Sequence, residues 1–204
     1  IVEGEHYHIF NRGVEKRIVL NNARDYSRFL FLILYCQSSI RFQNMHRAVE
    51  QFSKTLQYSE SDNVIKNRSV ELVAFCFMPN HFHLIVKEIE EGGISKYMQR
   101  VQNSYTKYFN TKYERSGHLF QSSYRAVHVI NDRQLLHLSA YIHRNPREMN
   151  DWINRESKYP WSSFKDYIEE NRWKDLLSTE IILGIYRHKK DYEKFVDTST
   201  TKLL

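Results

Sequence analysis

Long apolar runs are missing from this sequence of 204 residues. The longest, FLFLILYC at residues 29–36, falls well short of the roughly 18 apolar residues that a bilayer-crossing helix needs. No secretory signal pattern precedes the first predicted strand. We therefore expect no membrane segment and a soluble, cytoplasmic protein, with a few native residues ahead of Ile1 because the chain does not begin with Met.

Cysteine and glycine are also scarce, at two and six residues. Cys36 and Cys76 both lie in apolar strings, which predicts reduced core thiols rather than the disulfides of a secreted fold. No G-x-x-x-x-G-K-[ST] motif is present to cradle phosphates. The predicted strands also lack the aromatic-rich glycine motif of RNA-recognition domains. The sequence thus gives no sign of a nucleotide cofactor or of that RNA-binding fold.

Basic residues are concentrated in one part of the chain, whose net charge is +6. Between Lys96 and Arg147, nine Lys and Arg residues stand against two acidic ones, a net +7, so the remaining residues together carry −1. A local basic field of this kind favours binding of a polyanion, because each neutralised phosphate releases counterions. A solvated surface with a chance bias would give the same count.

Alternation, apolar stripes and turn signals predict an α+β protein. The predicted strands lie at 7–10, 70–77, 81–88 and 123–130, and helices follow Asn22 or Asp25, Gly92-Gly93 and Asp132. The resulting order β-α-β-β-α-β is that of a ferredoxin-like antiparallel sheet, with helices on one face and an added helix over 132–145 that Pro146 ends. Polar residues 58–69 predict an exposed loop. From Asp151 onward we expect a packed, mainly helical extension with a helix near 179–196.

Two histidine pairs flank an aromatic residue, at 6–8 and at 81–83. On a strand, residues i and i+2 share a face, so the two imidazoles of each pair project together. Such a pair is half of a metal site, but structural histidines are common and the pattern alone is weak. We expect the first pair to lie beside the site, with His8 a bystander.

The helix predicted at 132–145 complements the second pair. His137, Tyr141 and Asn145 follow at intervals of four residues and so share one face, at the edge of the apolar stripe. The residue pattern leaves other interpretations open. Tyr141 could be an ordinary edge tyrosine, and Asn145 only the last residue of a helix.

Three motifs in register carry a resemblance to a known family. MPNHFHLIV, GHLFQSSYRA and LSAYIHRNPRE resemble the HUH single-tyrosine transposases, and most closely the REP-associated tyrosine transposases. The similarity runs from about Tyr7 to Trp161 and includes YHIFNRG and YPWSS. Many members carry Gly-Arg where this chain has Ser122-Ser123, so a DNA contact is either lost or shifted to Arg125.

The resemblance implies a catalytic domain over residues 1–150 and an extension over 151–204, in a bacterial enzyme that is nucleoid-associated when bound to DNA. It also implies that single-stranded DNA is cleaved and rejoined near hairpins through a 5′-phosphotyrosine intermediate. By this resemblance Tyr141 is the nucleophile, and His81, His83 and Asn145 hold a divalent metal. Two imidazoles and an amide oxygen suit Mg²⁺ or Mn²⁺, and leave Zn²⁺ open.

The remaining predictions concern residues around this centre. The candidate DNA-binding residues are Arg12, Lys96, Arg100, Lys107, Arg125, Arg144 and Arg147. His137 either assists proton transfer or is a surface histidine. A non-catalytic DNA or RNA hairpin-binding protein on the same fold is the alternative function, and the protein is expected to be a monomer or a homodimer.

Overall fold

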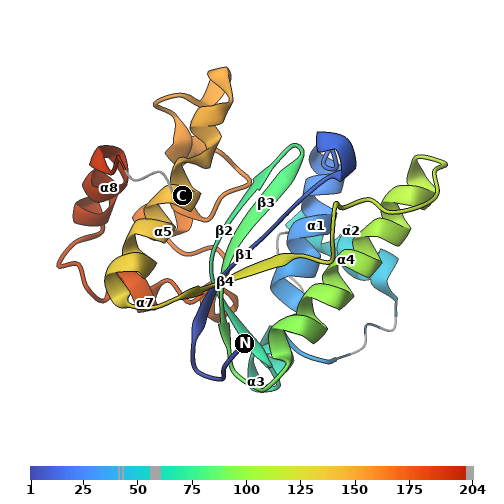
Figure 1. The fold of residues 1–204 in the computed structure, drawn as a ribbon, viewed down its shortest axis with the longest axis horizontal. Coiled ribbons are helices and arrows are strands. Elements are labelled where there is room, and N and C mark those ends of the chain that lie inside the picture. Colours follow the sequence, from blue (N-terminus) through green and yellow to red (C-terminus); the bar gives the residue numbers. More distant parts are fainter. Residues whose placement is uncertain (41, 43, 56–60, 201–204) are drawn as a thin grey trace.

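A four-stranded antiparallel sheet lies at the middle of the molecule (Figure 1). The computed structural model describes residues 1–40, 42, 44–55 and 61–200. The strands are β1 (His6–Arg12), β2 (Val70–Met78), β3 (His81–Glu88) and β4 (Arg125–Val129), in the spatial order β2-β3-β1-β4. Together with the chain order this confirms the predicted ferredoxin-like sheet.

Helices cover both faces of this sheet (Figure 1). One face packs against α1 (Ala23–Tyr35) and α4 (Gly93–Lys112), with α2 (Met45–Thr55) packed on α1, and the other face packs against α5 (Asp132–Arg144) and the C-terminal segment. Side chains alternate between the two cores, so that Leu84 and Val86 join the first and Ile85 joins the second. The histidines of β3 share the face of Ile85, which is the α5 side.

Local side-chain bonds fix where the two key helices begin. Asn22 caps α1 by accepting from the backbone N–H of Asp25, whereas the Asp25 carboxylate is buried and bonds to Tyr108, Tyr113 and Lys112 of the α4 region. The cap of α5 is Asn131, one residue before the predicted Asp132. This helix ends at Arg144, since Pro146 has no N–H to continue it.

Two predictions about the chain between these elements were wrong in part. Residues 61–66 of the predicted 58–69 loop form α3 (Ser61–Lys66), which buries Val64, while 58–60 lie outside the described residues. The helix expected near 179–196 is two helices, α7 (Glu180–Leu183) and α8 (Lys189–Thr198). They are separated because His188 has extended backbone and starts a new cap with Asp191.

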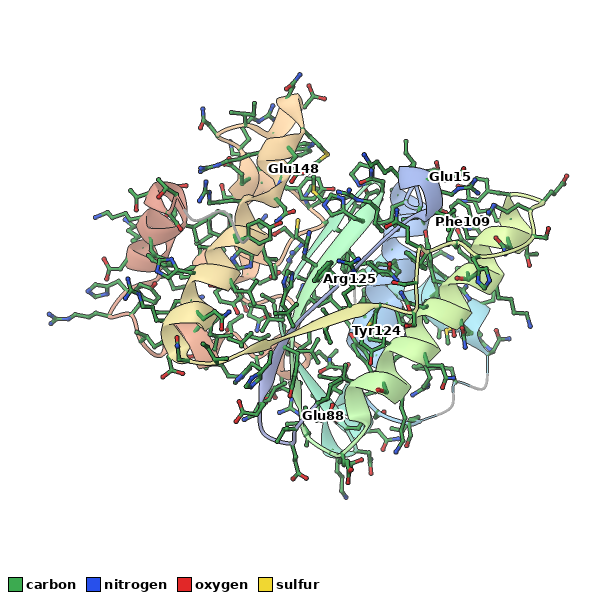
Figure 2. All side chains as sticks on the ribbon, viewed as in Figure 1. Glu15, Glu88, Phe109, Tyr124, Arg125 and Glu148 are labelled. Atoms are coloured by element: carbon green, nitrogen blue, oxygen red, sulfur yellow. The ribbon has the colours of Figure 1, made fainter. Side chains whose placement is uncertain are left out.

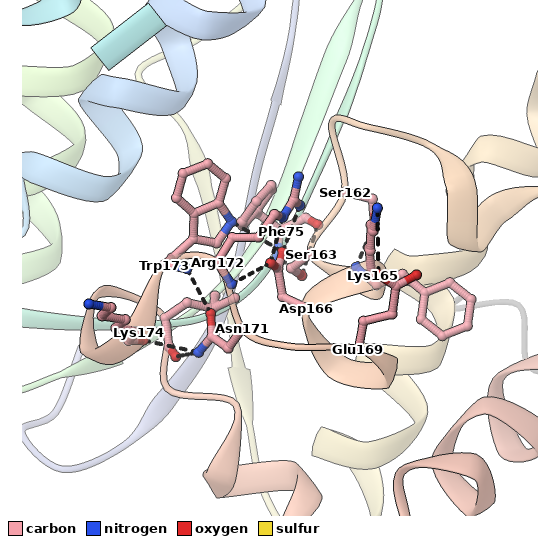
Figure 3. A network of polar contacts seen from close by, with 12 residues as sticks. Phe75, Ser162, Ser163, Lys165, Asp166, Glu169, Asn171, Arg172, Trp173 and Lys174 are labelled. Atoms are coloured by element: carbon pink, nitrogen blue, oxygen red, sulfur yellow. Dashed lines mark hydrogen bonds and ion pairs between the residues drawn. The ribbon is translucent and has the colours of Figure 1, made fainter. Parts of the chain in front are cut away.

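The C-terminal segment seals the outer edge of β2. Backbone bonds join Phe77 N–H to Trp161 O, Ser163 N–H to Phe75 O and Ser178 N–H to Leu72 O, at 2.9–3.0 Å. Figure 3 shows Ser163 beside Phe75 and the Asp166 carboxylate held by Arg172 and Trp173. The remaining short helices are η1 (Val14–Lys16), η2 (Asn145–Glu148), η3 (Asn150–Trp152), η4 (Glu156–Lys158), α6 (Phe164–Ile168) and η5 (Lys174–Leu176).

The same segment shares its apolar side chains with the rest of the chain. Phe164 and Tyr192 lie in one cluster with Leu138 of α5, and Trp173 lies in the cluster of α1. A common core therefore joins the parts before and after residue 150. The predicted division into a catalytic domain and an extension stays a prediction. Cys36 and Cys76 are buried and free, as expected. Among the described residues, no helix is both long and apolar enough to cross a bilayer.

Candidate active site

The histidine pair of β3 lies at the centre of the sheet face that α5 covers. In the β1–β3 ladder Arg12 lies opposite His81 and Phe10 lies opposite His83. In the β1–β4 ladder Phe10 lies opposite Arg125. His81 and His83 are both buried, at 6% and 8% exposure. Alternation along three neighbouring strands thus gathers two imidazoles, an aromatic ring and two guanidinium groups on one face.

Each ring of this pair uses its Nδ1 atom in a hydrogen bond. The Nδ1 of His81 lies 2.6 Å from the Asn80 side-chain oxygen, which can only accept, so Nδ1 carries the proton and Nε2 keeps a lone pair. The Nδ1 of His83 lies 2.9 Å from Nε2 of His8. When His83 donates to His8, its own Nε2 is likewise free for a metal.

Asn145 adds an unpartnered oxygen to this set. Its side-chain N–H donates to the Tyr141 carbonyl at 2.9 Å. Its Oδ1 is buried and has no hydrogen-bond partner within the described protein. A buried acceptor without a partner is costly unless something binds it. No group of three His, Cys, Asp or Glu residues suited to a metal exists in the described part of the chain.

Burial keeps these imidazoles neutral. Desolvation lowers the pKa of His81 to about 4, with a further contribution from the Arg12 charge, and lowers that of His8 to about 4. The pKa of His83 lies well below its usual value because of burial and its neighbours His8 and His81. The neutral ring is the form that binds metals, and neither ring of the pair carries the extra proton that would prevent this at neutral pH.

Tyr141 of α5 lies over the rings of His83 and His8. Its ring centroid is 5.5 Å from that of His83 and 6.3 Å from that of His8, both at edge-on angles. Burial and the negative charge of Glu148 raise the pKa of the Tyr141 phenol, while Asn145 and Arg12 act against this. The phenol is therefore protonated at neutral pH. A single chain brings together all four residues predicted for catalysis and metal binding.

A cleft of about 430 Å³ opens beside these rings. His81, His83 and Tyr141 form part of its wall, and Arg12, Arg125 and Glu148 are among the other residues that line it. Figure 2 labels Arg125 on β4 and Glu148 just beyond α5. A hollow with two guanidinium groups beside buried neutral imidazoles is suited to an anionic group.

The candidate DNA-binding residues divide into several groups. Arg12 and Arg125 line the cleft. Lys96 and Lys107 are exposed on α4, across the sheet from Tyr141. Arg100 donates to the carbonyls of Ser38 and Ile40, and Arg147 is ion-paired with Glu156, so both side chains are engaged within the fold. Two guanidinium nitrogens of Arg144 are buried without a partner in the described protein. DNA contact by all seven stays a prediction.

Three further residues change the sequence-based picture of the site. His137 packs on Phe195 of α8 and does not line the cleft, so its role in proton transfer stays a prediction. His8 is more than a bystander, because it bonds directly to His83. The i, i+2 spacing of His6 and His8 was the sequence signal that could have pointed to this contact. Glu148 was missed, and no local pattern marks it.

Comparison with known protein families gives one match for this chain. The family model described as "Transposase IS200 like" matches residues 40–145, more than half of the chain. The chain belongs to this transposase family. The resemblance to HUH single-tyrosine transposases is thereby confirmed, and with it a DNA transposase-like function in the broad sense.

One solved structure extends the match beyond the part covered by the family model. The transposase is similar to a chain described as the REP-associated tyrosine transposase bound to a REP hairpin, with a TM-score of 0.55 and 16% identity. The match covers 82% of this chain and 81% of the other, and at this identity it shows a shared fold. Comparison with curated proteins gives no match.

Proposed function

We propose that the protein is a metal-dependent DNA transposase that cleaves and rejoins single-stranded DNA near hairpin-forming elements. The observation that carries this proposal is the meeting of His81, His83 and Tyr141 in one cleft that also holds two arginines, with the Asn145 side chain bonded to the Tyr141 backbone beside it. Family membership supports the DNA substrate. The solved relative is bound to a REP hairpin, which supports a hairpin partner here.

Tyr141 is the proposed nucleophile. Its Oη forms a bond to phosphorus, and the bond between phosphorus and the 3′ oxygen breaks. The phenol loses its proton and the departing 3′ oxygen gains one, so a 5′-phosphotyrosine and a free 3′-OH result. The bond energy is kept in the adduct, so the 3′-OH of another strand can reverse the step without a nucleotide cofactor.

The residues present fit a divalent metal. Two imidazole Nε2 atoms and the unpartnered Asn145 Oδ1 form a mixed nitrogen and oxygen set that suits Mn²⁺ or Mg²⁺. A bound metal would polarise a non-bridging phosphate oxygen and orient the scissile bond. Arg12 and Arg125 would hold the phosphate by charge-assisted hydrogen bonds.

Covalent trapping tests this function. Incubation with Mn²⁺ and a panel of fluorescent single-stranded hairpin oligonucleotides should give a labelled protein band that survives denaturation. Tyr141→Phe should abolish the band, because the ring remains but the nucleophile is gone. Tyr186→Phe, a half-buried tyrosine of the C-terminal segment, is the matched control and should keep it.

Two other outcomes would overturn the proposal. The first is the absence of an adduct with every hairpin, and the second is an adduct that persists in Tyr141→Phe. Hairpin binding that survives both His81→Ala and Tyr141→Phe, needs no metal and gives no adduct would instead indicate the non-catalytic hairpin-binding protein.

A further inference from the structure

We propose that a second cavity beside the cleft binds one unpaired nucleobase of the strand that Tyr141 cleaves; this inference rests on the proposed function. The cavity has a volume of about 280 Å³ and lies between β4 and α5. It shares Phe10, His83 and Tyr141 with the cleft. Because a base hangs on the sugar next to its phosphate, a cavity with three walls in common suits the base that flanks the cleaved phosphodiester.

The walls of this cavity have the character of a base pocket. Val127 and Val129 of β4 and Leu138 of α5 provide apolar surface, and the Phe10 ring adds an aromatic one. Val129 and Leu138 are buried, whereas Val127 is 49% exposed and so lies toward solvent. Apolar walls with a few fixed polar groups are typical of small-ligand sites, and aromatic rings stack on any base because each base has a π-face.

Gln134 supplies one fixed hydrogen-bond donor. Its Oε1 accepts from the backbone N–H of Ile130 at 2.7 Å, which settles the orientation of the amide. The Nε2 group consequently faces away from that bond. It has no hydrogen-bond partner in the described part of the chain, and Gln134 lines the cavity.

His8 supplies a second donor when His83 has the tautomer that leaves its Nε2 free. Its side chain is 9% exposed and its Nε2 is bonded to His83. When His83 donates from Nδ1 and so keeps Nε2 for a metal, the single proton of neutral His8 lies on Nδ1. That N–H has no partner among the described residues, and His8 lines the cavity. Two donors favour a base with a carbonyl oxygen over adenine, which has none.

Base removal along the substrate tests the cavity. Each nucleotide of an adduct-forming hairpin oligonucleotide is replaced in turn by an abasic one, and the Kd is measured by fluorescence anisotropy with Mn²⁺. The Tyr141→Phe protein is used so that no cleavage occurs. One position next to the cleaved phosphate should show a roughly tenfold loss of affinity, the size expected for one stacked base.

Filling the cavity should remove this dependence. Val127→Trp places a large ring in the cavity, so the abasic and intact oligonucleotides should bind with equal affinity. Ile130→Trp is the matched control, since Ile130 is 71% exposed and does not line the cavity, and it should keep the tenfold difference. Gln134→Ala should reduce the preference for thymine or guanine over adenine at that position, whereas Arg133→Ala should not.

The outcomes separate this inference from the proposed function. An adduct that forms normally, together with an abasic penalty unchanged in Val127→Trp and a base preference unchanged in Gln134→Ala, overturns the nucleobase pocket alone. The same holds if no position near the cleaved phosphate shows a penalty. Absence of any adduct with the wild-type protein overturns the proposed function, and the pocket with it.

Discussion

His8 shows how one residue can set the state of its neighbour. It bonds to Nδ1 of His83 across the β1–β3 ladder, in a region that desolvates both rings. Residues that hold the far nitrogen of a metal-binding histidine fix its tautomer and orientation. The sequence showed that His8 and His83 each lie on a strand face. It could not show that the two faces meet, because strand register is a long-range property.

Removing this contact should weaken metal binding. We expect His8→Ala to lower Mn²⁺ affinity by about 10–100-fold, because His83 loses the partner that orders its ring. Isothermal titration with Mn²⁺ measures this directly and does not depend on turnover. His128→Ala is the matched control, since His128 is on the exposed edge strand and pairs with Glu5. Equal affinities for His8→Ala and the wild type would contradict the role.

At the scale of elements, α5 is held from behind by a buried polar chain. His143 lies on the side of α5 opposite Tyr141, with Nδ1 2.6 Å from the Tyr192 hydroxyl and Nε2 2.8 Å from the Ser163 hydroxyl. Tyr192 in turn donates to Ser139, and Ser163 accepts from Phe75 N–H of β2. The C-terminal segment thereby ties the tyrosine-bearing helix to the sheet.

The Tyr192 hydroxyl is the central link of this chain. Tyr192→Phe should lower the free energy of unfolding by about 1–3 kcal/mol, because His143 and Ser139 lose a shared partner in a region without solvent. Urea denaturation measures the change. Tyr186→Phe, on the same segment, should stay within about 0.5 kcal/mol of the wild type. Equal losses of stability in the two variants would show that the hydrogen bonds of the Tyr192 hydroxyl make no particular contribution.

Elements were predictable where their signal was local. Strands β2 and β3 followed from the two runs predicted at 70–77 and 81–88, and α5 from its apolar stripe and Pro146. α3 escaped prediction because it is short and polar, and its formation depends on packing of Val64. Glu148 escaped because a bend after α5, and no periodic pattern, brings it to the cleft.

For the molecule as a whole, buried neutral histidines make stability depend on pH. Burial lowers the pKa of His8 and His81 to about 4 and that of His143 to about 3, against 6.5 in the unfolded chain. Below pH 6.5 these histidines bind protons in the unfolded chain but stay neutral in the folded protein. The free energy of unfolding should therefore be highest above pH 6.5 and fall steadily toward pH 4.

Denaturation of metal-free protein at a series of pH values checks this expectation. Each such histidine contributes a slope of up to about 1.4 kcal/mol per pH unit within its window. His81→Gln should reduce the slope by about one proton, because it removes one of these buried rings. A flat profile between pH 6.5 and 4 would contradict the assignment of neutral buried rings.

The sealed edge of β2 also limits how this protein can aggregate. A fibril grows only when every chain offers two free strand edges, one to receive a neighbour and one to pass the pairing on. In the described chain the sheet ends at β2, whose edge is bonded to residues 161, 163 and 178, and at β4, which pairs with β1 alone. Edge-to-edge pairing through β4 would therefore stop at two molecules and could not propagate.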